Sequence, residues 1–394
     1  MKKIIKTFNN LIQKTIFKVE NKTNNKFNIS GFIQSVIKYE KTDGAVASNY
    51  MNARNTYLSI SGSMYKEKVS FLMQNNFSNG KPLLDAWVAY SPTSNMKITF
   101  GQKQTFTNNR EMTFYEDKLQ FVDRGIFSSE FSNTGREFGM FFESQFGLKS
   151  IIIKPKFSIT SGDGVNSFGA NSIDVDKGGL KYGARLDLLP LGKFKPGNDG
   201  YIADLLHEDT IKILTGAAYS FNNGASNRVG EGHGDFVFYD KDLKQKLPDY
   251  RKWYGDILIK YKGFSLLGEY VNSSALSLEG SYLNSTATIP LFMTEISNYL
   301  VLGNGYNIQS GYVTKSGFSL DFKYEKLTKE FTKTTSLLSN QDAMTIGITK
   351  YLKGNNLKIQ SSVSTRNTEQ FNTVLNANEN VKTLTAQISF LVVF

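Results

Sequence analysis

The feature that most constrains this chain is a strict alternation of apolar and polar residues, repeated along its length in segments of about ten residues. In the last segment the two alternating sets are Leu384, Ala386, Ile388 and Phe390 against Thr383, Thr385, Gln387 and Ser389. Successive side chains of a β-strand point to opposite faces, so each segment has one face suited to an apolar medium and one suited to water. This length is also the length that a tilted strand needs to cross a bilayer.

The alternation predicts sixteen strands, with boundaries good to a few residues. They lie near 27–40, 54–65, 67–78, 83–92, 95–104, 135–146, 148–161, 178–189, 210–221, 251–262, 263–273, 305–314, 316–326, 341–352, 355–366 and 381–394. An even number returns both chain ends to the same side, as single-chain bacterial barrels require.

The links between these strands alternate between short and long. Short turns are expected at Lys66, 92–94, Gly147, 262–263, 315–317 and 353–355, and long loops at 41–53, 105–134, 162–177, 222–250, 274–304, 327–340 and 367–380. Short periplasmic turns and long outer loops are typical of outer-membrane barrels. Residues 190–209 break the pattern, because they form a long link where a short turn is expected.

No apolar run approaches the roughly 18–20 residues of a membrane helix. Only helices and closed barrels satisfy the backbone in lipid, so a spanning chain with this pattern must close into a barrel. We therefore predict an all-β fold, a transmembrane antiparallel barrel in the bacterial outer membrane, where lipid and lipopolysaccharide surround it. A soluble all-β protein with many hairpins is the alternative, but such proteins rarely chain sixteen hairpin strands of this length.

The ends of the chain and its composition add a few limits. Residues 27–394 are assigned to the barrel, and residues 1–26 to an arm that is either a short amphipathic helix or the remnant of an export signal. The net charge of +11 allows nucleic acid, anionic lipid or an anionic solute as partner. Its basic residues are scattered without a reader motif, so no nucleic-acid partner is expected.

The strand registers also predict which charges face the lumen. The inward basic residues are Lys38, Lys97, Lys103, Lys154, Lys156, Lys181, Arg185, Lys212, Lys260, Lys323, Lys358 and Arg366, and the inward acids are Asp85, Glu137, Glu143, Asp187, Asp256, Glu269, Asp321 and Glu325. Twelve bases against eight acids favour anions weakly. A basic wall is expected where Lys154, Lys156, Lys181 and Arg185 lie on adjacent strands, although a register slip of one residue would turn it to the lipid.

Residues 97–146 carry the most recognisable motifs. A strand ends in Phe100-Gly-Gln-Lys103, the pair Arg110-Glu111 and the run Phe121-Val-Asp-Arg-Gly125 follow, and Gly135-Arg-Glu-Phe-Gly139 opens the next strand. Together with Phe27–Phe32, Leu84–Val88 and the terminal Phe394, their order resembles the phosphate-selective porin O and P family. The resemblance implies a sixteen-stranded, usually trimeric pore whose third loop folds into the lumen.

Matched position by position, the resemblance places Lys103, Arg110, Arg124 and Arg136 in or beside the pore constriction. The chain departs from the family at Thr105, where a proline is common, and in the five acids of its third loop. The dense lumen ladder of arginines is also not evident. We therefore expect a homotrimeric porin that passes small hydrophilic solutes passively, with a weak preference for anions, phosphate among them.

An enzyme is not expected. Cysteine is absent, and the two histidines, His207 and His233, lie in expected links rather than on strands. Neither has the converging partners that a catalytic or metal site needs, so we expect no catalytic residues, metal or cofactor. A non-conducting surface adhesin, or a structural barrel that partners an envelope complex, is the alternative that the long loops 222–250 and 274–304 leave open.

Overall fold

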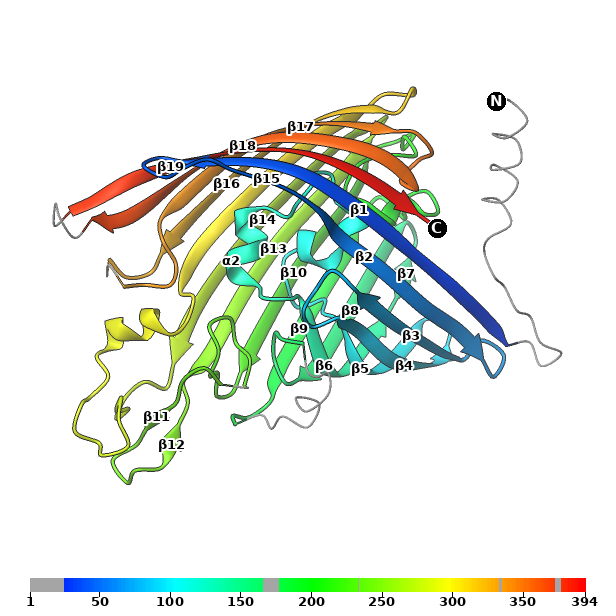
Figure 1. Ribbon diagram of the computed structural model, residues 1–394. Helices are drawn as coiled ribbons and strands as arrows, with labels where there is room; N and C mark the ends of the chain where they lie inside the picture. Colours follow the sequence, from blue (N-terminus) through cyan, green and yellow to red (C-terminus); the bar gives the residue numbers. More distant parts are fainter. Residues whose placement is uncertain (1–24, 166–176, 233, 333–334, 373–376) are drawn as a thin grey trace.

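The computed structural model describes residues 25–165, 177–232, 234–332, 335–372 and 377–394, and in these the chain forms a closed antiparallel barrel (Figure 1). Strand β1 closes the sheet, because it pairs with β2 on one side and with β19 on the other. Short strand β7 extends β6, since both pair with β8, so the wall has sixteen strands.

The wall strands coincide with the predicted ones. They are β1 (Lys26–Thr42), β2 (Ser48–Met64), β3 (Val69–Asn76), β4 (Leu83–Thr93), β5 (Met96–Gln104), β6 (Arg136–Ser144), β7 (Phe146–Leu148), β8 (Ile151–Thr160), β9 (Lys181–Leu189), β10 (Lys212–Asn222), β13 (Asp249–Tyr261), β14 (Phe264–Leu276), β15 (Gly303–Val313), β16 (Phe318–Lys329), β17 (Gln341–Tyr351), β18 (Leu357–Asn372) and β19 (Ala377–Val393). The prediction of a sixteen-stranded antiparallel barrel is confirmed.

Three predicted links were wrong. Residues 41–53 and 367–380 are mostly strand, because β1 with β2 and β18 with β19 continue as paired ribbons toward the outer rim. Both faces of such a ribbon meet water beyond the bilayer, so the apolar alternation that marks a strand is lost there. Gly147 lies within β7, and the turn follows at Lys149, whose φ is +55°. Of the predicted arm 1–26, residues 1–24 lie outside the described residues.

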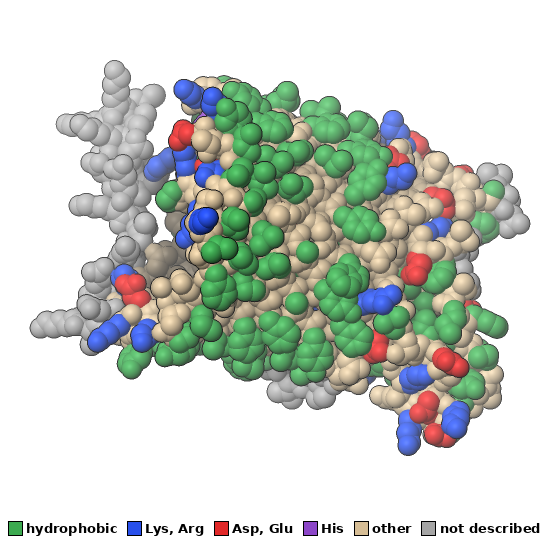
Figure 2. Space-filling view, turned by 180° about the vertical axis from the view of Figure 1, so that it is seen from behind, with side chains coloured by type: hydrophobic (Ala, Val, Ile, Leu, Met, Phe, Trp, Pro, Cys, Tyr) green, Lys and Arg blue, Asp and Glu red, His purple; other side chains and the backbone are tan. Residues whose placement is uncertain are grey.

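An apolar outer face surrounds the barrel. Outward side chains on opposite parts of the wall are exposed, among them Ile33, Val88, Phe100, Trp253, Ile308, Ile346 and Phe390. Figure 2 shows hydrophobic side chains spread over this face, with charged side chains mostly at the two ends. Exposed apolar side chains in this arrangement match the lipid-facing band of an outer-membrane barrel. No helix of the described residues is long and apolar enough to cross a membrane.

The long link 190–209 folds back against the periplasmic end of the barrel interior. Lys260 of β13 donates from its ammonium group to the carbonyls of Asn198, Tyr201 and Ala203, at 2.5, 2.7 and 3.1 Å. Phe194 and Ile202 of the link are buried in an apolar cluster with wall residues. The link is long because it covers part of the lumen, which a short turn could not do.

The outer loops form a layer of their own. They contain the hairpin β11 (Phe238–Tyr239) and β12 (Gln245–Lys246) and the 3₁₀ helix η5 (Met293–Asn298). Buried apolar residues from loops 223–248 and 277–302, among them Phe238, Leu291 and Ile296, pack together. This layer gives the outer rim an apolar core, which Tyr250 of β13 and Ala275 of β14 join to the outer end of the barrel wall.

Candidate pore constriction

The third loop, residues 105–135, lies inside the barrel (Figure 1). It contains the 3₁₀ helices η1 (Glu111–Thr113) and η2 (Glu116–Lys118) and the short helix α2 (Ile126–Phe131). A further 3₁₀ helix, η4 (Asn198–Gly200), lies in the 190–209 link. Hydrogen bonds join the loop to side chains on β1, β2, β4, β9, β13, β14, β16 and β18. A loop that reaches strands around the circumference must cross the lumen.

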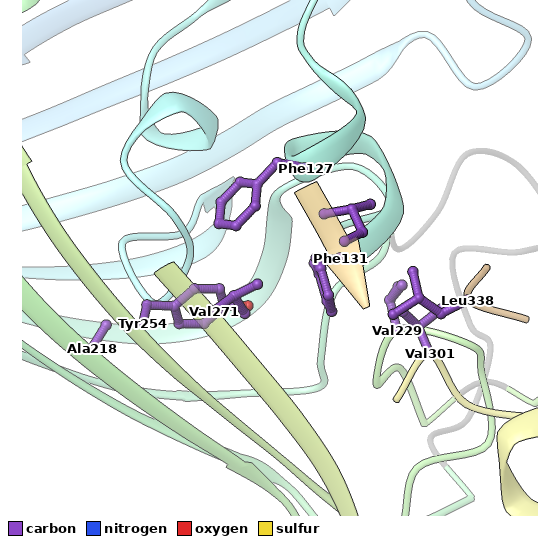
Figure 3. Packing of buried hydrophobic residues seen from close by; sticks show 9 residues of the cluster. Phe127, Phe131, Ala218, Val229, Tyr254, Val271, Val301 and Leu338 are labelled. Carbon is purple, nitrogen blue, oxygen red and sulfur yellow. The ribbon is translucent and has the colours of Figure 1, made fainter. Parts of the chain in front are cut away.

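Apolar contacts hold α2 against one side of the wall. Phe127 and Phe131 are fully buried and pack with Ala218 of β10, Tyr254 of β13 and Val271 of β14 (Figure 3). Phe114 and Leu119 of the loop belong to a second cluster, which includes Ile202 of the 190–209 link. Burying each of these side chains contributes about 1.5–3 kcal/mol, so the loop is packed in place and not suspended in water.

A buried cluster of four charges attaches the beginning of the loop to β9 and β13. Arg110 donates through Nε to Asp256 at 2.9 Å and through Nη2 to Asp187 at 2.5 Å. Arg185 donates to the same two carboxylates. Gly216 of β10 leaves the necessary space, because a Cβ there would lie 2.4 Å from Arg185 Nη2 and 2.6 Å from Arg110 Nη2.

A second buried ionic cluster lies on the opposite side of η1. Glu111 accepts from Lys323 of β16 and from the hydroxyl of Ser128. Although burial alone would raise its pKa, the neighbouring ammonium group of Lys323 holds the pKa of Glu111 below its usual value. The carboxylate therefore stays charged, as a buried ion pair with additional hydrogen bonds requires.

Lysines of the wall also bind the backbone of the loop. Lys358 of β18 donates to the carbonyls of Asp117 and Leu119 at 2.9 and 3.0 Å. Lys252 of β13 donates to the carbonyls of Phe131 and Val229. Each inserted carbonyl loses water and gains a charged donor, which satisfies the rule that buried polar groups are hydrogen-bonded. These ammonium groups are thus occupied by the protein itself.

The side of the loop that faces β2, β4 and β6 carries a ring of paired charges. Tyr115 donates to Asp85 at 2.7 Å, and Tyr57 donates to Glu116 at 2.6 Å. Arg124 binds Glu116 at 3.0 Å, and Arg136 lies 3.6 Å from Asp85. These residues, from the loop and three strands, form the charged ring on this side of the described lumen, called the constriction ring below.

The carboxylate at the centre of this ring stays ionised. Burial alone would raise the pKa of Glu116, but the guanidinium groups of Arg124 and Arg136 hold it at about 2. Its oxygens accept hydrogen bonds from Tyr57 and Arg124, which explains how a carboxylate is tolerated there. Two guanidinium groups thus face two carboxylates, Glu116 and Asp85, and the ring has no net charge.

The predicted constriction residues divide into two groups. Arg124 and Arg136 lie in the ring, each beside a carboxylate. Arg110 is buried in the four-charge cluster, where both its partners are aspartates, and therefore faces no solute in this conformation. Lys103 lies on β5 with its ammonium group 2.6 Å from Glu143 and 5.1 Å above the ring of Phe141.

The predicted basic wall points inward, but most of it is paired. Lys156 and Arg185 both bind Asp187, at 2.9 and 2.8 Å. Lys181 binds Glu137. Lys154 alone of the four makes no ion pair within the described part of the chain, and it is half-buried. The four residues therefore do not form a continuous open surface for anions.

Lys97 is a functional candidate that the motif comparison did not single out. It lies on β5 opposite Glu143 of β6, which in turn lies opposite Lys156 of β8. Its ammonium group rests 4.5 Å from the centre of the Trp87 ring and makes no ion pair among the described residues. The alternation had marked Lys97 as inward, but only the register across three strands places it in line with Glu143 and Lys156.

Potential metal ligands and one of the two histidines, His207, are among the described residues. No group of three His, Cys, Asp or Glu side chains there could hold a metal ion. His207 lies in the 190–209 link against the periplasmic turn at Gly263. His233 lies outside the described residues.

Comparison with known proteins rests on structure alone. No family model matches the sequence, and no curated protein matches it. An anion-selective porin of Comamonas acidovorans is similar in fold, with a TM-score of 0.57 and 9% identity over 94% of this chain and 100% of that one. The outer-membrane channel DcaP of Acinetobacter baumannii has a TM-score of 0.54 and 13% identity, over 94% of this chain and 99% of DcaP.

A third similar structure is the trimer form of OmpT, an outer-membrane protein of Vibrio cholerae, with a TM-score of 0.52, 8% identity and coverage of 93% and 99%. At such low identity these likenesses show the fold and not the solute. The chain therefore has the fold of outer-membrane porins. The resemblance to the phosphate-selective porin family is not confirmed by these similar structures. The closed barrel and its apolar outer face place the chain in the bacterial outer membrane.

Proposed function

We propose that the chain is a non-enzymatic porin through which small hydrophilic solutes diffuse passively, with a weak preference for anions, phosphate among them. The observation that carries this proposal is the contrast between the two faces of one closed sheet: apolar side chains outside, and polar or charged side chains inside. The crossing of loop 3 supports a narrow channel of small conductance.

The weak anion preference is supported by the charges near the periplasmic end of β5, β6 and β8. Lys97, Lys154 and Lys156 lie there, and the ammonium group of Lys103, which belongs to the loop-3 end of β5, pairs with Glu143. Asp187 pairs with Lys156 but is shared with two arginines, so it neutralises this group only in part. A local excess of ammonium groups raises the concentration of anions in a narrow channel. The neutral ring above it argues against a site specific for phosphate.

The test is single-channel recording of the purified full chain in planar bilayers under a salt gradient. We expect small steps, a reversal potential that favours anions modestly, and no block by phosphate added to chloride. The double variant Lys97→Met/Lys154→Met should move the permeability ratio toward unity. Lys353→Met, at an exposed periplasmic turn, is the matched control and should leave the ratio unchanged.

We also propose that the protein is a homotrimer embedded in lipid and lipopolysaccharide. The support is the fold, because the similar OmpT structure is a trimer form. Light scattering of the protein in detergent, corrected for bound detergent, would give the mass of the assembly. A monomer mass would contradict this part of the proposal without affecting conduction.

A second candidate function is a surface adhesin or a barrel that partners an envelope complex. The outer loop layer favours it, because Leu243, Ile289, Phe292 and Met293 are exposed apolar side chains beyond the barrel wall. If the purified protein is folded as a barrel and shows no conductance at all, this candidate is favoured over the porin.

A further inference from the structure

A polar cavity lies on the outer side of the constriction ring, between loop 3 and strands β2 to β4. Its volume is about 280 Å³, just below the roughly 300–1,000 Å³ of common ligand pockets. Tyr57, Glu116, Arg124 and Arg136 of the ring form part of its wall. A solute that approaches the ring from the outer side would enter this cavity first.

The cavity is lined mainly by groups that both donate and accept hydrogen bonds. Its amides are those of Asn55, Asn76, Asn79 and Asn133, and loop 3 adds the hydroxyls of Ser129 and Thr134. Within the described residues the side chain of Asn133 makes no hydrogen bond, and the NH₂ group of Asn79 is likewise free. Such groups match a solute that carries many hydroxyls, because a hydroxyl also donates and accepts.

The charges around the cavity cancel. Arg124 is held by Glu116 and by two carbonyls of loop 3, so it is not available to an incoming anion. Arg136 faces Asp85 and Glu116. An anion in the cavity would gain one guanidinium and meet two carboxylates, and a zwitterion would have to break the Arg124–Glu116 pair. The balance therefore favours an uncharged solute.

A buried guanidinium in the wall is incompletely hydrogen-bonded, because the nearest acceptor, Asp85 Oδ1, lies 3.6 Å from Arg136 Nε. Arg136 is 3% exposed, and its Nε and Nη2 make no hydrogen bond in the described structure. An unsatisfied buried donor costs about 1–3 kcal/mol, so an oxygen supplied from the cavity is favourable there. Leu84 and the side chain of Tyr57, which is stacked on Phe32 at 4.3 Å, add an apolar part to the same cavity.

From these observations we propose that the cavity is a binding subsite for a neutral saccharide of about one or two rings. Hydroxyls would bind the amides and Arg136, and the apolar face of a ring would lie against Tyr57 and Leu84. This inference rests on the proposed porin function and names the solute class that its outer vestibule selects. The basic group at the periplasmic end acts separately, on small ions.

The experiment measures block of the single-channel current by sucrose and by glucose, each added to the outer side. We expect saturable block by sucrose in the wild-type chain. In the double variant Asn79→Ala/Asn133→Ala, the loss of two amide hydrogen bonds should weaken the apparent affinity by about tenfold. Asn95→Ala, an exposed asparagine in the turn before β5, is the matched control and should keep the wild-type affinity.

A polyethylene glycol of the same size as sucrose separates binding from crowding. Equal block by both compounds, or sucrose block that the double variant does not weaken, would overturn the subsite. Block by phosphate in place of sucrose would overturn it in favour of an anion site. If the protein does not conduct at all, the porin proposal fails, and calorimetric titration of sucrose into the detergent-solubilised wild type and double variant decides the subsite independently.

Discussion

The attachment of loop 3 to the wall can be tested at Arg110. The four-charge cluster of Arg110, Arg185, Asp187 and Asp256 is joined by Lys156, which pairs with Asp187, so three cations face two carboxylates. Replacing Arg110 by methionine leaves two cations and two carboxylates. No uncompensated charge is created, so the barrel should keep its stability, and only the loop loses its link to β9 and β13.

The magnitude follows from the bonds that are lost. Arg110 makes two hydrogen bonds to carboxylates, and each such bond contributes about 1.5–3 kcal/mol. Because Arg185 continues to satisfy both aspartates and the methionine stem is buried in place of the arginine stem, we expect a net loss of about 3 kcal/mol. That corresponds to about a hundredfold rise in the ratio of detached to attached loop.

Hydrogen exchange read by mass spectrometry is the assay, because amide exchange reports local opening. Peptides within 105–120 should exchange up to about a hundredfold faster in Arg110→Met. The control is Arg54→Met, which removes another wall-to-loop pair, Arg54 with Asp123, at 3.0 Å. Both of these side chains are partly exposed, so the loss there should be at most about 1 kcal/mol. Equal exchange in the two variants would refute the reasoning that burial makes the Arg110 cluster the stronger attachment.

Three further outcomes are expected. Asp256→Asn leaves three cations facing one carboxylate, so it should destabilise the protein by about 3–5 kcal/mol, more than Arg110→Met does. The measurement is the temperature at which the barrel unfolds, read from the shift between the folded and unfolded bands in gel electrophoresis. Gly125→Ala should also lower that temperature, because its Cβ would lie 1.9 Å from Glu325 Oε1, whereas Gly200→Ala meets no atom within 4 Å and should not. The pKa of Glu116 is lowered from 4.5 to about 2, so its contribution to loop attachment is complete above pH 4.5 and is lost as the pH falls toward 2. The difference in loop-3 hydrogen exchange between the wild type and Glu116→Gln should therefore be the same at pH 7 and pH 5, and a change in that difference would contradict this reasoning.

The inward orientation of the charged residues could be predicted from the sequence. Lys260, Lys323 and Lys358 were placed on the inner face by alternation alone, and each is buried inside the barrel. Alternation is a local property of an extended chain, so it holds whatever the strand later pairs with. What each charge would contact could not be predicted in the same way.

The contacts of those lysines could not be predicted, although their inward orientation could. Counted as lumen charges, they suggested a twelve-to-eight excess available to anions, but Lys358 binds carbonyls of loop 3 and Lys260 binds carbonyls of the 190–209 link. Lys358 and Asp117 are 241 positions apart, and no sequence pattern marks a backbone carbonyl as a partner. The selectivity suggested by counting charges is therefore reduced by the inserted segments.

Local sequence thus specified the strands, their faces and all the short turns except the one predicted at Gly147, because apolar alternation and turn residues act over a few positions. It also marked loop 3 and the link 190–209 as unusual, without showing where they go. Closure of the barrel brought Asp187 and Asp256 to Arg110 of loop 3, and Asp85 to Arg136 of β6. Those pairings depend on distances across the lumen, which exist only once the sheet has closed, and they decide which charges a solute can meet.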